Sequence, residues 1–272
     1  MPYVRWKMRK VDLIAAREES KITPSIVNGI KVVDVTLTQA SHHLASKYGV
    51  ATHEVNNANR ASGYGPTEVF KGKTTLDTAE FEVAGKEGEL AASIYLMGND
   101  WSAIQRWVIG TGDSGDLAFW QKGQQKIIDV KIRTKPEHTC FKLTLKQWRN
   151  HYPDYYVSTQ YPNDDREKVR IWGYVERRKI DALVIAETKR ILGKPLKWDY
   201  LGTGAQKHVR MTNEELDALA AELEKSPELG RLPESEINCY GIGELDGYGP
   251  PVIAIPFTLL SPIEELRKII SS

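Results

Sequence analysis

Residues 112–134 read "GDSGDLAFWQKGQQKIIDVKIRT", and this stretch decides the fold. Two runs typical of β-strands, 116–120 and 125–133, are joined by a short polar turn, which predicts a hairpin. Successive side chains of a strand point to opposite faces. One face of the second run therefore carries the apolar side chains Ile128, Val130 and Ile132. The opposite face carries Asp129, Lys131 and Arg133.

Pairing of the two runs would bring Asp116 and Asp129 together on one face. Neighbouring carboxylates repel each other, and a divalent cation relieves that repulsion. Hard oxygen ligands select Mg²⁺ or Mn²⁺. Lys131 beside them can position or deprotonate a water molecule, or stabilise charge that develops on a phosphate. The alternative is an ordinary amphipathic hairpin with a solvated charged face, since about a quarter of the residues in soluble proteins are charged.

A helix with acidic residues precedes the hairpin. The sequence "GELAASIYLMG" (88–98) belongs to a predicted helix over residues 78–97 that ends before Gly98. Helical spacing puts four side chains on one face, namely Glu89, Ala92, Ser93 and Leu96. The small residues would let this face lie close to a sheet, so that Glu89 reaches the aspartates. Glu87 is the second choice, and Asp113 competes with Asp116 for the role of ligand.

The order of these elements resembles the PD-(D/E)XK nuclease superfamily. Gly115-Asp116 stands where that family has Pro-Asp, although glycine replaces the proline. Asp129-Val130-Lys131 stands as its (D/E)-x-K, and residues 88–98 look like its first helix. The segments that follow are similar as well, with a helix start in "KLTLKQW", a strand in "PDYYVSTQY", and "VRIWGYVERRKI" as a strand that enters a helix. The resemblance covers roughly residues 80–182.

The resemblance implies an α/β fold, a restriction-endonuclease-like core in which helices flank a central mixed sheet of about four or five strands. It implies hydrolysis of phosphodiester bonds in double-stranded DNA with Mg²⁺, or Mn²⁺ in its place. Glu89, Asp116 and Asp129 would be metal ligands, with the carbonyl of Val130 as a further one. Lys131 would be the positioning or activating group. Because cutting both strands usually takes two active sites, a homodimer is expected.

A second segment, "LASKYGVATHEVNNANR" (44–60), resembles helix-turn-helix units. One helix would begin at Thr38 and end at Gly49, and another would begin at Thr52. Four polar side chains share a face of the second helix, namely His53, Asn56, Asn57 and Arg60. Asparagine suits adenine and arginine suits guanine in the major groove. The alternative is a helical hairpin that packs on the core with these side chains solvated. Near the aspartates, the expected DNA contacts are Arg133 and Lys135.

The chain has 272 residues, of which 41% are hydrophobic, and this allows one large domain or a central domain with additions. We expect an N-terminal region (1–65) with a small helical DNA-binding-like segment, a nuclease-like core (66–195) and a C-terminal α+β extension (196–272) packed on the core. Expected strands include 30–38, 103–110 and "PPVIAIPF" (250–257), the last an edge strand because prolines flank it. Further helices are expected to begin at Thr212 and at Ser261-Pro262.

Composition limits the function classes. A net charge of +1 indicates that any affinity for nucleic acid comes from local patches. The sequence holds no apolar run of about 18 residues, so no membrane span is expected, and its start lacks the apolar core of a secretory signal. Cys140 and Cys239, far apart, favour a reducing intracellular compartment such as the cytoplasm.

Two hypotheses from different classes follow. The first is a Mg²⁺-dependent DNA endonuclease, of restriction type or from a mobile element, phage or plasmid. The second is a non-catalytic DNA-binding or regulatory protein with a helix-turn-helix. A third possibility is a metal-free α/β protein in which Asp129 and Lys131 form only a surface ion pair.

Overall fold

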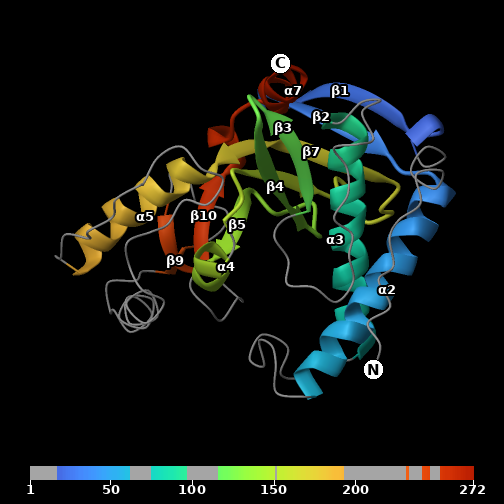
Figure 1. Cartoon of the computed structure of the whole chain (residues 1–272), viewed down its shortest axis with the longest axis horizontal. Coiled ribbons are helices and arrows are strands. Elements are labelled where there is room, and N and C mark those ends of the chain that lie inside the picture. The colour runs from blue at the N-terminus through green and yellow to red at the C-terminus, as the bar shows by residue number, and fades with distance from the viewer. Residues whose placement is uncertain are drawn as a thin grey trace.

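A six-stranded mixed sheet forms the centre of the computed structural model, which describes residues 17–61, 75–96, 116–150, 152–192, 231–232, 241–245 and 252–272 (Figure 1). In spatial order its strands are β1 (Lys21–Val27), β2 (Ile30–Thr36), β7 (Lys168–Glu176), β6 (Tyr155–Gln160), β4 (Gln124–Arg133) and β3 (Leu117–Gln121). Neighbouring strands are antiparallel except β4 and β6, which run parallel. The predicted hairpin is therefore present as β3 and β4, joined at Lys122 and Gly123, both with positive φ.

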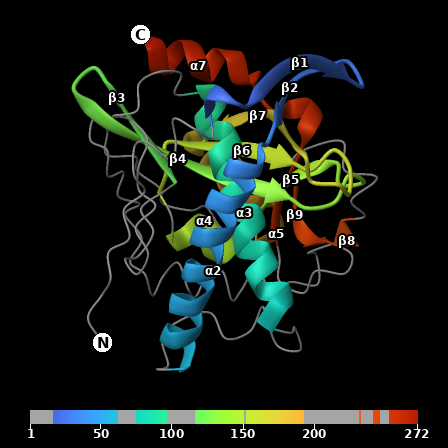
Figure 2. The ribbon, with the colours of Figure 1, turned by 90° about the vertical axis from the view of Figure 1, so that its right-hand side faces the viewer.

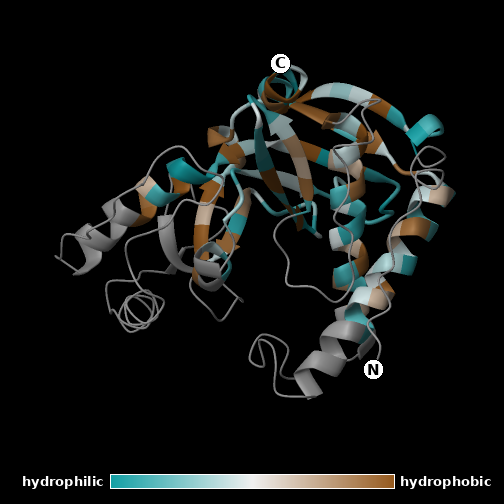
Figure 3. Cartoon of the chain, viewed as in Figure 1, coloured by the Kyte–Doolittle hydropathy of each residue, from teal (hydrophilic) through white to brown (hydrophobic). Residues whose placement is uncertain are grey.

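A smaller sheet packs beside the first. In spatial order its strands are β5 (Cys140–Thr144), β10 (Val252–Pro256), β9 (Gly241–Leu245) and β8 (Arg231–Leu232). The sequence predicted an edge strand near β10, but β10 lies between β5 and β9 and is buried along its length, where Figure 3 shows it largely hydrophobic. The reason is that Pro256 occupies only the last position of the strand, so the residues before it keep the N–H groups that a central strand needs.

Helices cover both faces of the large sheet. The described helices are α2 (Gln39–Ala61), α3 (Thr75–Leu96), α4 (Leu145–Asn150), α5 (Arg177–Leu192) and α7 (Ile263–Ser271), with a 3₁₀ turn η2 (Phe257–Leu259). Figures 1 and 2 show α2 and α3 side by side on one side of the sheet and α7 near its upper rim, while the second sheet and α5 lie on the other side. The fold class is mixed α/β, as the sequence predicted, and α3 confirms the helix expected over 78–97.

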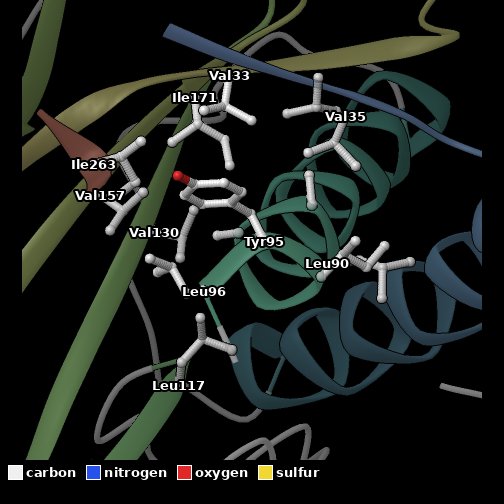
Figure 4. Close-up of a cluster of buried hydrophobic side chains, with 14 of the residues drawn as sticks. Val33, Val35, Leu90, Tyr95, Leu96, Leu117, Val130, Val157, Ile171 and Ile263 are labelled. Carbon is white, nitrogen blue, oxygen red and sulfur yellow. The ribbon is translucent and has the colours of Figure 1, made fainter. Parts of the chain in front are cut away.

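Each face of the large sheet has its own core. On the α3 side, Tyr95 packs among Val130, Val157 and Ile171 (Figure 4). On the opposite side, Trp172 belongs to a cluster that the second sheet and α5 complete. The C-terminal half of α3 is buried all round because α2 covers its outer side. A helix in this position can present polar groups to the sheet without contact with solvent.

The two sheets join strands from all three of the expected regions of the chain. Strands β1 and β2 belong to the same sheet as β6 and β7, and β10 pairs with β5 from the middle of the chain. Several expected features lie outside the described residues, namely the linker at 62–66, the strand at 103–110, the helix from Thr212, Asp113 and Cys239. No helix among the described residues is long and apolar enough to cross a membrane.

The expected helix-turn-helix is absent from the described segment 39–61, which forms the single helix α2. The sequence predicted a stop at Gly49, but the helix runs through it. The glycine instead permits close packing on α3, because a Cβ at Gly49 would lie 2.6 Å from the Cα of Val83. Glycine here reflects helix-to-helix contact and not a turn.

We predict that Gly49→Ala destabilises the protein by about 1–3 kcal/mol, because the new methyl group would overlap backbone atoms of α3. Gly85 in α3 is the matched control, since a Cβ there meets nothing within 4 Å. Gly85→Ala should therefore stabilise the protein by about 0.5–1 kcal/mol through helix propensity. Urea unfolding measures both changes. Equal changes in the two variants would contradict the close approach of α2 to α3.

Candidate active site

Asp116 lies directly before β3, at the point where β3 stops covering the edge of β4. Its backbone N–H donates to the carbonyl of Ile128 at 3.0 Å. Its carboxylate Oδ2 accepts a hydrogen bond from the backbone N–H of Val130 at 2.6 Å. The Asp116 side chain thus accepts from the Val130 N–H, which has no partner in β3. This hydrogen bond fixes the buried carboxylate beside the middle of β4.

Asp129 and Lys131 form an ion pair on β4. Lys131 Nζ donates to Asp129 Oδ1 at 2.7 Å. Asp129 is 4% exposed, and its second oxygen, Oδ2, is buried with no hydrogen-bond partner among the described residues. The apolar residues of the same strand, Ile128, Val130 and Ile132, pack in the core on the α3 side, as the alternation predicted. The strand therefore places an unsatisfied buried oxygen at the site.

Helix α3 packs on the face of β4 that carries Val130, and the charge of its Glu89 raises the pKa of Asp116. Gly88 allows the approach, since a Cβ there would lie 2.8 Å from Thr159 Oγ1 of β6. Glu89 is buried and its two oxygens accept hydrogen bonds from Lys86 Nζ at 2.8 and 2.7 Å. Glu87, the second choice from the sequence, turns away from the aspartates and accepts hydrogen bonds from His42 Nδ1 at 2.8 Å and from the Tyr161 hydroxyl.

The charges of the site act on one another. Burial, followed by the negative charges of Glu89 and Asp129, raises the pKa of Asp116 well above its ordinary value. Burial alone would lower the pKa of Lys131, but Asp129 and Asp116 outweigh it, so that the pKa of Lys131 is raised. The positive charges of Lys131 and Lys86 thus compensate only part of the repulsion that Asp116 experiences from Glu89 and Asp129.

This donor set fits a hard divalent cation in part. Asp129 Oδ2 is a buried acceptor without a partner, and Asp116 lies close enough for its charge to be coupled to that of Asp129. Glu89 is bonded to Lys86, and no group of three His, Cys, Asp or Glu residues within the described part of the chain is already assembled around one point. Asp116 and Asp129 are therefore the primary ligand candidates, whereas both oxygens of Glu89 are bonded to Lys86. The structure gives Val130 a role through its N–H, which holds Asp116.

The sequence reasoning missed a buried polar cluster next to Asp129. Tyr156 of β6 is the strand partner of Asp129 and is fully buried. Its hydroxyl accepts a hydrogen bond from Arg177 Nη1 at 3.2 Å, and Arg177 Nε donates to Asp181 Oδ1 at 2.6 Å. Burial raises the pKa of Tyr156 to about 12, with Asp129 adding to the rise and Arg177 opposing it. The signal in the sequence was the i, i+4 pair Arg177 and Asp181 at the start of a helix.

The expected DNA-contacting residues fare differently. His53 and Arg133 are buried, at 4% and 6% exposure, so neither presents its side chain at the surface here, and their contact with DNA stays a prediction. Lys135 is exposed beside Glu137 at 3.7 Å. Asn56, Asn57 and Arg60 belong to α2, but their side chains lie outside the described part.

Comparisons of the chain with protein-family models, with curated proteins and with solved structures find no match. The function therefore has to be inferred from the residues of the site and their geometry.

Proposed function

We propose that the protein is a divalent-metal-dependent DNA endonuclease that hydrolyses phosphodiester bonds at the site formed by Asp116, Asp129 and Lys131. The observation that carries the proposal is the ion pair of Asp129 and Lys131 on β4, with the buried Asp116 close enough to act on it by its charge. Asp129 is bonded to Lys131 through one oxygen and keeps its other oxygen free of protein partners among the described residues. Ordinary surface ion pairs are exposed on both partners, whereas Asp129 is 4% exposed.

Each residue of the proposed site has a role that follows from its position. Asp116 is fixed by the N–H of Val130, so its carboxylate is oriented before any ligand arrives. The ammonium of Lys131 can donate to an oxygen of the scissile phosphate, where negative charge develops. Tyr156 is the partner of Asp129 on the neighbouring strand β6, and Arg177 at the start of α5 holds the Tyr156 hydroxyl in place.

Mg²⁺ or Mn²⁺, when bound by Asp116 and Asp129 with Glu89 as a third carboxylate, would supply positive charge for the phosphate and for the attacking oxygen. Hard oxygen donors of this kind suit these ions. The chain lies near electrical neutrality overall, so contact with DNA would depend on local residues such as Lys135.

The rival hypothesis, a regulator that reads DNA with a helix-turn-helix, is weakened by the continuous helix α2. Without a turn at Gly49, the segment offers no second helix set at an angle to the first. Binding of DNA by α2 along its length is a different proposal, and nothing about the described side chains of α2 favours it.

Incubation of the purified chain with supercoiled plasmid tests the proposal. We expect nicked or linear product with Mg²⁺ and none with EDTA, and Asp129→Asn should reduce the rate by roughly 10²-fold or more, because it removes a ligand charge. Linear product indicates two cuts in one encounter, as expected from a homodimer. Asp154→Asn is a matched control, since Asp154 also pairs with a lysine of β4 but does so at the opposite end of the strand. Equal rates for wild type and Asp129→Asn would contradict the assignment.

A further inference from the structure

A pocket of about 300 Å³ lies between the two sheets, near Gln160 at the C-terminal end of β6. It is lined by residues of the β1–β2 turn, the loop after β4, β6, β7 and η2, among them Asn28, His138, Gln160, Trp172, Phe257 and Thr258. Its volume is at the lower end of the range for ligand sites, which suits one ring system and excludes a double helix.

Hydrogen bonds of the buried Gln160 amide hold the wall of the pocket in place. Gln160 Nε2 donates to the carbonyls of Lys135 at 2.7 Å and of His138 at 2.8 Å, which fixes the loop after β4. Trp172 Nε1 donates to Gln160 Oε1 at 2.7 Å, and the ring of Trp172 stacks on Phe257 at 4.4 Å between centroids. A buried amide thus joins an aromatic wall to the loop that follows the strand of Asp129.

A β-bulge brings Trp172 into this wall. The β6–β7 ladder passes from the pair Ser158 and Gly173 to the pair Thr159 and Ile171, so that Trp172 is an extra residue in β7. Gly173 has φ +154°, and a Cβ there would lie 2.5 Å from the carbonyl oxygen of Ser261, so only glycine fits. Bulges of this kind redirect a side chain, often next to a functional site.

The pocket continues the face of the sheet that carries the proposed active site. Lys131 is paired with Ser158, and Arg133 with Gln160, so Gln160 lies on the same face as Lys131 and two residues further along. Two residues of a strand span about 7 Å. A group held in the pocket would therefore lie within one or two nucleotides of a phosphate at Lys131.

The chemistry of the lining suits a flat, neutral ring with polar edges. Trp172 and Phe257, stacked on each other, supply an aromatic part of the lining, and Asn28, His138 and Thr258 add polar groups to it. The guanidinium of Arg170, which also lines the pocket, lies over the ring of Trp172 at 5.6 Å and is paired with Asp34 at 2.8 and 3.0 Å. With this charge balanced, the pocket suits a nucleobase better than a phosphate.

We propose that this pocket binds an unpaired nucleobase of the DNA strand whose backbone lies at Asp129 and Lys131. The inference rests on the proposed nuclease function for its ligand, but it concerns a separate set of residues. It would direct the enzyme to DNA with an extrahelical or single-stranded base, since a paired base is not available to the pocket.

Binding without metal tests the pocket separately from cleavage. Fluorescence anisotropy in EDTA compares a short duplex carrying one unpaired adenine with the fully paired duplex of the same length. We expect the wild-type chain to bind the first roughly tenfold more tightly, a typical effect of one stacked base. Thr258→Phe, an exposed rim residue enlarged to fill the pocket, should remove the preference, while Thr258→Ser should keep it.

Pro136→Phe, an exposed residue of the lining loop, repeats the filling from a second element, and thermal melting verifies that each variant is folded. Equal affinity of the wild type for the two duplexes, or a preference kept by both folded filling variants, would overturn the proposal. Free adenosine added at the concentration of the duplex should not displace it. Displacement would mean that the pocket takes free nucleosides and would overturn the strand as the source.

The two proposals fail in different ways. A chain that prefers the unpaired base but does not cut plasmid with Mg²⁺ keeps the pocket and loses the nuclease. A chain that cuts plasmid but shows no preference keeps the nuclease and loses the pocket.

Discussion

Lys131→Ala should lower the rate of plasmid cleavage by about 10²–10³-fold, the usual cost of removing one donor that stabilises charge in a transition state. The variant should bind DNA in EDTA nearly as well as the wild type, because one lysine is a small part of a surface that contacts many phosphates. Its loss should therefore appear in cleavage and not in affinity. Nicking of supercoiled plasmid in Mg²⁺ and gel shift in EDTA measure the two properties.

Lys126→Ala is the matched control for Lys131→Ala. Lys126 lies on the same strand and also pairs with an aspartate, Asp154, at 3.0 Å, but it lies five residues away from Lys131 along β4. Cleavage by this variant should stay near the wild-type rate. If Lys131→Ala cuts as fast as Lys126→Ala, then Asp129 and Lys131 are a structural ion pair and the endonuclease assignment is wrong.

Asp129→Ala should separate the two properties in another way. It should abolish cleavage like Lys131→Ala, yet bind DNA more tightly in EDTA than Lys131→Ala does, because it removes a negative charge that faces the phosphates. The order of the two affinities in EDTA therefore reports on which side of the sheet the DNA lies.

The strand pattern of β3 and β4 was predictable because the two-residue alternation of a strand depends only on local geometry. The faces of Ile128, Val130 and Ile132 were confirmed. The hairpin of β1 and β2 could have been predicted too, since Asn28-Gly29 is a turn pair in which both residues adopt positive φ. The signal for this hairpin is local, because it lies in the turn pair itself.

Contacts between distant segments were not predictable from local pattern. Glycine is typical of a helix end, but at position 49 it is required by the close approach of Val83 from α3. The sequence of α2 alone does not predict this contact. Glu87 and Glu89 are equally acidic in sequence, and only the fold decides that Glu87 meets His42 and Tyr161 while Glu89 acts on Asp116. The choice of Glu89 followed from its small neighbours on one helical face.

Gln147, which follows the strand of Asp129, has a local structural role. Its Oε1 accepts a hydrogen bond from the N–H of Thr144 at 3.1 Å, and its own N–H donates to Thr144 Oγ1 at 3.0 Å. This is a capping box at the start of α4. The position of glutamine after the Asp129 strand therefore reflects the helix start and adds nothing to the candidate site.

Asp116→Asn should make the metal-free protein more stable at neutral pH. The pKa of Asp116 is raised in the folded chain by burial and by Glu89 and Asp129, whereas the unfolded chain has the ordinary value near 3.8. Below that value both states are protonated and the folded state pays no penalty. As pH rises from there through the raised pKa, the unfolded state ionises more readily, so folded stability is lost, by about 1.4 kcal/mol for each pKa unit of the shift.

Asparagine keeps the shape of the side chain and can still accept the hydrogen bond from the N–H of Val130 through its amide oxygen. Urea unfolding in EDTA at several pH values should show the variant and the wild type alike below the ordinary pKa and the variant ahead above the raised one. Asp34→Asn is the control with the opposite sign, because it removes the partner of Arg170 and should destabilise the protein at neutral pH.

The effect of Mg²⁺ on the stability of the wild type and of Asp116→Asn is a second test. If the carboxylates hold the ion, millimolar Mg²⁺ should stabilise the wild type, since a ligand that binds only the folded state adds RT ln(1 + [L]/Kd) to its stability. The same Mg²⁺ should leave the stability of Asp116→Asn nearly unchanged. The stability difference between the variant and the wild type should therefore shrink or change sign. An equal effect of Mg²⁺ on both proteins would place the ion elsewhere, and a wild type with no loss of stability between acid and neutral pH would show that Asp116 is not held among like charges.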